Sequence, residues 1–253
     1  MKPFKIYPFN KKLTLHFSGK RVKPSSVLKK EINNFWNDLI SSGKKYSRGE
    51  VFTVVKKEVT DKEIKILLDQ TDYAHYLYST QVDLGNNSVR VIHSAVMVET
   101  ADNYIVMGKM GQQTARAGTY QFSGGGLGKG DLKDGFFDLD YATRRELLEE
   151  FNLDVLDEKR VKDFAPIYFK EGGPTDKMTV IYQVKLRGSK KNFFSQYEKF
   201  VSDLKYKGQA PEFESLVAFK NNLQGIEEFF SQHRNQKFDE YMLPLFEYIK
   251  SQL

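Results

Sequence analysis

Cysteine is absent from the 253 residues of this chain. Disulfides, iron–sulfur clusters and thiolate zinc sites are therefore excluded. No stretch approaches the roughly 18 apolar residues of a membrane span, and segment 1–17 lacks the continuous apolar run of a secretory signal. Internal repeats and low-complexity tracts are absent as well. These absences predict a cytoplasmic protein that has no membrane partner.

The residues that are present describe an ordinary globular chain, with 40% hydrophobic and 28% charged residues. Its length allows either one elaborated domain or two modest ones. The net charge of +6 is uneven, because residues 1–60 hold 14 Lys and Arg against 4 Asp and Glu. A basic segment can bind RNA or attract anionic small molecules. Its lysines are scattered among apolar residues, so we expect a solvated surface rather than a nucleic-acid site.

The first third of the chain is typical of a small α+β module. A Ser-Ser cap, apolar residues at helical spacing and a terminal Gly43 predict a helix over 25–41. Segments 50–60 and 63–73 alternate apolar and polar residues, as two paired strands do. A polar Gly-Asn-Asn stretch follows at 85–87. We therefore predict an N-terminal module at 1–85 and a second domain at 86–253.

The second domain mixes strands with helices. Its patterns predict strands at 89–99, 104–110, 119–122, 164–170 and 179–186, and helices at 138–152, 225–232 and 238–253. The strand at 119–122 leads directly into the glycine cluster "SGGGLGKGD" at 123–131. That cluster lacks the Lys-Ser/Thr pair of a Walker phosphate loop.

The helix over 138–152 carries the most informative residues. Glu146, Glu149 and Glu150 share one face, because residues three and four apart on a helix are neighbours. Like charges at this spacing repel by roughly 0.2–0.5 kcal/mol per pair, and a divalent cation would offset that repulsion. Mg²⁺ prefers oxygen ligands and binds carboxylates together with substrate phosphates. The alternative is a solvent-exposed helix that packs through Ala142, Leu147, Leu148 and Phe151.

The segment "RELLEEFNL" at 145–153, with "FSGG" at 122–125, resembles the signature of the Nudix hydrolases. This resemblance implies an α/β/α sandwich with a mixed sheet, preceded here by the smaller module. It implies Mg²⁺ or Mn²⁺ as cofactor, held by Glu146, Glu149 and Glu150. It also implies that Glu149 and Glu150 are catalytic and that Arg145 orients the glutamates.

The sequence departs from the family signature in its loop half. The loop from Gly125 to Arg145 is about six residues longer than the signature, and Phe137 stands where the first glutamate is expected. Asp134 or Asp138 could substitute for that glutamate. Asn152 replaces a glycine after the helix, a tolerable change because Asn also adopts the left-handed conformation.

A narrower resemblance points to the Nudix branch that cleaves UDP-sugars. It is carried by segments 67–80, 171–186 and 211–219 and by the long N-terminal module. The implied reaction is hydrolysis of the diphosphate in a nucleoside diphosphate linked to another group. A UDP-sugar is the first expectation and an ADP-ribose-like compound the second. The alternative is an inactive Nudix-fold protein that binds or senses a nucleotide.

Several further residues are candidates for the nucleotide site. We predict that Arg116 contacts the diphosphate, because guanidinium matches phosphate geometry. Gln112, Tyr120, Gly124 and Gly125 are predicted beside it, although an ordinary polar hairpin loop explains Gln112, Arg116 and Tyr120 equally well. Glu214 is predicted as general base. His75 and His93 are interpreted as structural, and the N-terminal module could cap the site or build a homodimer interface.

Overall fold

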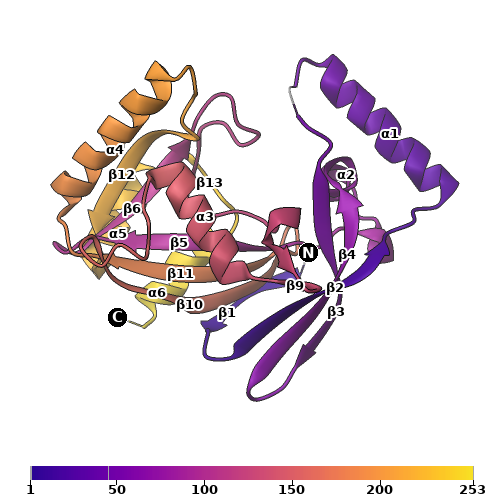
Figure 1. Cartoon of the computed structure of the whole chain (residues 1–253), viewed down its shortest axis with the longest axis horizontal. Coiled ribbons are helices and arrows are strands. Elements are labelled where there is room, and N and C mark those ends of the chain that lie inside the picture. Colours follow the sequence, from indigo (N-terminus) through magenta and orange to yellow (C-terminus); the bar gives the residue numbers. More distant parts are fainter. Residues whose placement is uncertain (1, 45, 253) are drawn as a thin grey trace.

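The computed structural model describes residues 2–44 and 46–252, which form a mixed α/β structure with two mixed sheets and flanking helices (Figure 1). Within these residues the larger sheet has eight strands. Seven of them lie in the order β1 (Lys2–Pro8), β10 (Val161–Gly173), β11 (Met178–Leu186), β5 (Ile92–Glu99), β6 (Tyr104–Met110), β7 (Thr119–Gln121) and β13 (Lys237–Phe238). The eighth strand, β12 (Phe213–Lys220), pairs with β6. The pairs β11–β5 and β13–β7 are parallel. The predicted mixed sheet is confirmed.

Helices cover both faces of the larger sheet. They are α3 (Leu139–Phe151) and α4 (Lys190–Tyr206) on one face, and α5 (Leu223–Gln232) and α6 (Met242–Lys250) on the other. Strand β5 contributes to the core on both faces of the sheet, because successive side chains of a strand point to opposite faces. Val96 and Val98 pack into the core under α3 and α4, whereas Ala95 and Met97 pack into the core under α5 and α6. The predicted α/β/α sandwich is therefore confirmed.

The smaller sheet has five strands within the described residues, in the order β3 (Glu50–Val59), β4 (Glu63–Asp72), β2 (Lys12–Arg21), β9 (Phe136–Phe137) and β8 (Leu132–Lys133). Helices α1 (Ser26–Ser41) and α2 (Tyr73–Gln81) accompany it. Leu28 and Ile32 of α1 pack against Ala74 of α2, and α1 begins as predicted at the Ser25 cap.

The two halves of the chain exchange strands. Strand β1 leaves the N-terminal module and pairs with β10 of the larger sheet. In return, β9 from the loop that precedes α3 pairs with β2 of the smaller sheet. The predicted boundary at residue 85 falls in a short 3₁₀ turn, η1 (Gly85–Asn87). Strand pairing therefore crosses that boundary in both directions.

Several elements escaped prediction. Helix α2 follows directly after the predicted strand 63–73, because the Asp72 side chain accepts a hydrogen bond from the His75 backbone N–H and caps a new helix. Strands β1, β8, β9 and β12 and helix α4 were not predicted, and the last helix spans Met242–Lys250 rather than 238–253. None of the described helices is long and apolar enough to cross a membrane.

Candidate active site

Helix α3 is fixed at both ends. The Asp138 side chain accepts a hydrogen bond from the Tyr141 backbone N–H at 2.9 Å and caps the start of the helix. At its end Asn152 adopts the left-handed conformation, with φ of 50° and ψ of 41°. This confirms that asparagine serves there in place of glycine. The glutamates thus stand on a rigid, well-capped element.

The three glutamates of α3 differ in exposure. Glu150 lies on the buried face and is only 3% exposed. The Glu146 side chain is largely covered, and the Glu149 side chain is 57% exposed. The exposed-helix alternative is therefore wrong for two of the three glutamates. A buried carboxylate needs a partner, and its partners here come from neighbouring segments.

The glycine segment runs along β5 and crosses above these carboxylates. The backbone N–H groups of Ser94 and Val96 donate to the carbonyls of Gly125 and Ser123. The Gly124 N–H donates to Glu150 Oε2 at 3.0 Å. A Cβ at Gly125 would lie 2.5 Å from Glu146 Cδ, so that any side chain there would require the Glu146 carboxylate to move. Glycine at 125 therefore lets the backbone approach the carboxylate.

Sequence reasoning missed a fourth carboxylate, Glu212. It precedes β12 and lines the same cavity as Glu146. In a regular strand, Glu212 and Glu214 would point to the same face. Phe213 pairs with Met110 and Ser215 with the adjacent Lys109, so the chain forms a bulge at Glu214 that breaks this alternation.

The predicted base Glu214 lies in that bulge and faces another way. Its carboxylate pairs with Lys109 at 2.7 Å and accepts a hydrogen bond from Gln112 at 3.3 Å. Gln112, predicted to bind substrate, is thus held by the same surface contact. Glu212 lies in the lining of the cavity, whereas Glu214 contacts Lys109 and Gln112.

Burial and the proximity of other carboxylates raise the pKa values of the clustered glutamates. Burial raises the pKa of Glu146 to about 7, with Glu149 and Glu212 adding to the rise and Arg145 opposing it. Burial also raises the pKa of Glu150 well above its usual range, and the nearby Glu212 raises it further. The pKa of Glu212 is raised as well, mainly by burial. Such crowding of acids in a cavity is typical of functional sites.

Arg145 contacts both the glutamates of α3 and Asp131, a residue that was not predicted from the sequence. Its guanidinium bonds both oxygens of the buried Asp131 at 3.3 Å. It also pairs with Glu146 at 3.0 Å and with Glu149 at 3.2 Å. Asp131 lies in the long loop, so this residue, rather than Asp134 or Asp138, supplies the acidic contact to Arg145. Asp138 instead caps α3, and Asp134 occupies a left-handed turn.

The donor set suits a divalent cation. Glu150 Oε1 is buried and has no hydrogen-bond partner in the described residues. Oxygen atoms of neighbouring carboxylates are the ligands that Mg²⁺ and Mn²⁺ prefer. Within residues 2–44 and 46–252 no three His, Asp or Glu side chains already converge on one point. The ion pairs from Arg145 to Glu146 and Glu149 would have to rearrange around a cation.

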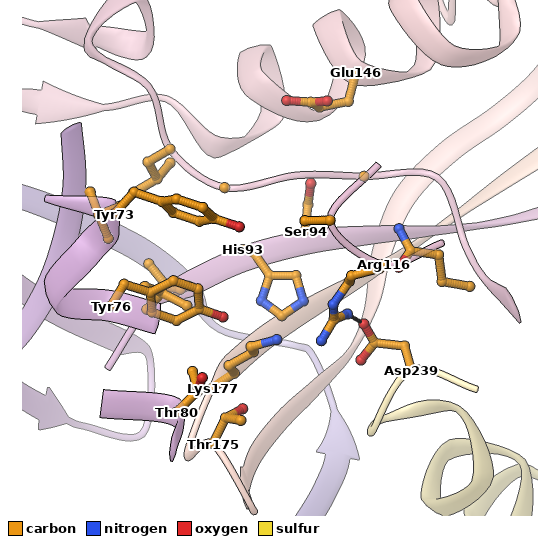
Figure 2. A pocket seen from close by; sticks show the side chains of 18 of the residues that line it. Tyr73, Tyr76, Thr80, His93, Ser94, Arg116, Glu146, Thr175, Lys177 and Asp239 are labelled. Atoms are coloured by element: carbon orange, nitrogen blue, oxygen red, sulfur yellow. Dashed lines mark ion pairs between the residues drawn. The ribbon is translucent and has the colours of Figure 1, made fainter. Parts of the chain in front are cut away.

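A cavity of about 830 Å³ opens beside the carboxylates (Figure 2). Arg145, Glu146 and Glu212 line its acidic end. The N-terminal module supplies another wall, with Tyr73, Tyr76 and Thr80 from α2. The larger sheet and its loops complete the cavity with His93, Ser94, Arg116, Thr175, Lys177 and Asp239. The site is therefore composite, built from both halves of the chain.

The other predicted ligand contacts divide between cavity and core. Arg116 lines the cavity, where it forms an ion pair with the buried Asp239. Gly124 lines it too. Tyr120 is buried elsewhere, and its ring contacts those of His233 and Phe238.

The histidines have mainly structural partners, as predicted. His75 is buried and bonds Thr71 and the Asn87 carbonyl, both at 2.9 Å. His93 lies 3.4 Å from the Thr179 hydroxyl. Burial, with the nearby Lys177, Lys170 and Arg116, lowers the pKa of His93 well below its usual value. Unlike His75, His93 also faces the cavity.

Comparison with known proteins finds similarity in structure alone: no family model and no curated protein matches the chain. One similar structure is the MutT protein from Methanosarcina mazei, with 12% identity over 64% of this chain and 94% of that chain, and a TM-score of 0.39. The NUDIX domain of Shewanella oneidensis NrtR, complexed with ADP ribose, has 10% identity over 72% and 99%, and a TM-score of 0.38.

A third similar structure is the pyrophosphohydrolase BsRppH from Bacillus subtilis, with 18% identity over 64% of this chain and 82% of that chain. Its TM-score is 0.36.

Proposed function

We propose that this protein is a Nudix-type hydrolase that cleaves the diphosphate of a nucleoside diphosphate linked to another group. The observation that carries the proposal is the acidic end of the cavity. There, Glu146, Glu150 and Glu212 crowd together beneath a glycine segment, beside a space large enough for a nucleotide. A UDP-sugar is the first candidate substrate and an ADP-ribose-like compound the second. Both are small-molecule nucleotides.

Glu146, Glu149 and Glu150 are the residues that would hold Mg²⁺ or Mn²⁺. Such a cation, when bound, neutralises negative charge on the departing phosphate oxygen. Arg145 keeps Glu146 and Glu149 in place through its own anchor on Asp131. The Gly124 N–H fixes one oxygen of Glu150, and the other oxygen, which lies near Ser123 and Glu212, is the one that would act as a ligand.

Glu212 is the residue to which we assign the role of proton acceptor, because it lines the cavity beside Glu146. In the proposed reaction, the oxygen of a water molecule bonds to one phosphorus, and the bond from that phosphorus to the bridging oxygen breaks. Glu212 accepts the proton that the water loses, and the two products each keep one phosphate. General bases of this kind contribute roughly 10²–10⁴-fold to rate.

The rival is a Nudix-fold module that binds a nucleotide without turnover. Its specific support is the pairing of Arg145 with Glu146 and Glu149, which occupies two of the three α3 carboxylates. Binding that is indifferent to Mg²⁺ would favour this rival. A second rival, RNA binding through the basic N-terminal segment, predicts steeply salt-dependent affinity.

The test is hydrolysis of a nucleotide panel with Mg²⁺ or Mn²⁺, coupled to a phosphatase that releases phosphate from the products. The panel holds UDP-glucose, ADP-ribose, NADH and a dinucleoside polyphosphate. Glu150→Gln and Glu212→Gln should each lower kcat by at least roughly 100-fold. Glu214→Gln is the matched control, two residues away, and should stay within about threefold of the parent because Glu214 pairs with Lys109 outside the cluster.

Turnover of one substrate class with this pattern would support the proposal and name the substrate. If no compound is hydrolysed while one of them binds tightly, the chain is a binding protein and the proposal fails. Equal losses in Glu212→Gln and Glu214→Gln would remove Glu212 from the mechanism.

A further inference from the structure

The end of the cavity away from Glu146 has the opposite character from the acidic end (Figure 2). Lys177 and Arg116 line it, and Lys170 lies directly behind, fully buried. Asp239 pairs with Arg116, and Glu240 accepts from Lys170 at 2.8 Å. The third cation, Lys177, shares Glu240 with Lys170.

Lys177 is 5% exposed and lines the cavity. The carboxylate that acts on its ammonium is Glu240, which already accepts hydrogen bonds from Lys170 and Thr175. The ring of Tyr76 lies below the Lys177 ammonium, with the centroid 6.0 Å from Nζ. Burial, with the nearby Arg116 and Lys170, lowers the pKa of Lys177 to about 7, and Glu240 opposes this shift. A buried ammonium that shares one carboxylate with a second lysine is costly, and an anionic ligand would offset that cost.

Neighbouring hydroxyl groups add further donors. Figure 2 shows Tyr73 and Tyr76 directing their hydroxyls from α2 into the cavity, on the side where Lys177 and Arg116 lie. Burial raises the pKa of both phenols, so they remain protonated donors at neutral pH. The guanidinium of Arg116 also faces the cavity, with its side chain 40% exposed beside Asp239.

The Lys177 position is held rigidly. Glu240 accepts hydrogen bonds from the Thr175 hydroxyl at 2.7 Å and from the Thr175 backbone N–H at 3.3 Å. The ammonium of Lys170 also donates to the Lys177 carbonyl at 3.2 Å. Both contacts fix the turn between β10 and β11 from beneath. The ammonium of Lys177 thus belongs to a preorganised turn, as a ligand-binding group should.

We propose that Lys177 and Arg116, with the hydroxyls of Tyr73 and Tyr76, form a second anion-binding subsite that takes an oxyanion of the ligand. The inference rests on the proposed function only for the identity of that ligand. Two sources share the required chemistry. The oxyanion is either the diphosphate itself or an acid carried by the group beyond it, such as the carboxylate of a uronic acid.

The first test needs no turnover. The melting temperature is followed against inorganic phosphate, with a chelator present so that no cation bridges phosphate to the glutamates. Phosphate should raise the melting temperature of the parent, of Lys177→Arg and of the exposed-lysine control Lys162→Met. Lys177→Met should lose that rise. It should still fold, since methionine fills the space without a buried charge. An equal rise in Lys177→Met would overturn the subsite.

The second test identifies the source of the oxyanion. KM is compared for UDP-glucose and UDP-glucuronate in the parent and in Lys177→Met. An increase of roughly tenfold for both substrates supports the subsite and assigns it to the diphosphate. An increase for UDP-glucuronate alone supports it and assigns it to the distal acid. Unchanged KM for both overturns it. Absence of turnover of both compounds, with the phosphate effect intact, would leave the subsite standing and count against a UDP-sugar as the substrate of the proposed hydrolase.

Discussion

Single residues decide how the acidic end of the cavity is built. Glu150 and Glu149 are adjacent in sequence, yet one is buried against the glycine segment and the other is 57% exposed. The third glutamate, Glu146, depends on Gly125, because the missing side chain of Gly125 leaves room for the Glu146 carboxylate. The spacing between backbone and carboxylate is therefore a property of one residue.

Gly125→Ala tests this spacing. The new methyl group would lie 2.5 Å from Glu146 Cδ and must push the carboxylate or the strand aside. Displacement of about 1 Å at a catalytic group can cost on the order of 100-fold in rate, and we expect kcat to fall by that amount in the coupled assay. The neighbouring Gly126→Ala is the control, because a Cβ there meets nothing within 4 Å. Comparable losses in both variants would contradict the model of a tight Gly125 contact.

At the scale of elements, α3 is the platform of the site. Its caps are local: Asp138 at the start and Asn152 in the left-handed conformation at the end. The Asn152 N–H donates to the Leu148 carbonyl at 3.0 Å, which closes the last turn beside Glu149 and Glu150. A helix so capped holds the backbone beneath its carboxylates in place, while the ion pairs of Arg145 with Glu146 and Glu149 would still have to rearrange around a cation.

Replacement of Asn152 should change stability according to backbone preference alone. A left-handed conformation costs an ordinary L-residue about 1–2 kcal/mol, so Asn152→Ala should lose about 1 kcal/mol in the free energy of unfolding by urea denaturation. Asn152→Gly should match the parent or exceed it slightly, since glycine adopts this conformation freely. If glycine and alanine destabilise equally, the Asn152 side chain has a contact that outweighs its backbone role.

On the scale of the whole molecule, the exchanged strands join the two sheets. Strand β1 carries the N-terminus into the larger sheet, and β9 carries the loop before α3 into the smaller one (Figure 1). Phe137 anchors that second crossing, with its ring 4.5 Å from that of Phe52 and 6.3 Å from that of Phe17. The cavity between the halves depends on these connections, because each half supplies part of its lining.

Phe137→Ala should therefore destabilise the whole chain. Removing a buried phenylalanine costs about 3–5 kcal/mol, and one cooperative transition should move as a unit in urea denaturation. The adjacent Phe136→Ala is the control: Phe136 is 49% exposed and Phe137 only 6%, so its loss should stay below about 1 kcal/mol. A biphasic transition in the parent, with Phe137→Ala affecting only one phase, would show that the halves unfold independently.

Local patterns in the sequence sufficed for much of this architecture. The caps and apolar spacing of α1 and α3 and the alternation of β3, β4, β5 and β6 identify these elements with nearly the observed bounds. Capping and periodicity depend on neighbours within a few residues, which a sequence displays directly. The same holds for Glu146, Glu149 and Glu150, whose common helix face follows from their spacing alone.

Only the tertiary structure determines which other residues lie next to those glutamates. A bulge in β12 selects Glu212 over Glu214, and the pairing of β8 and β9 with the smaller sheet accompanies the contact of Asp131 with Arg145. Lys177, Tyr73 and Asp239 meet in one cavity although they are far apart in the chain. Strand register, bulges and cavity walls depend on which distant segments pair and bury surface together, and no local pattern encodes that choice.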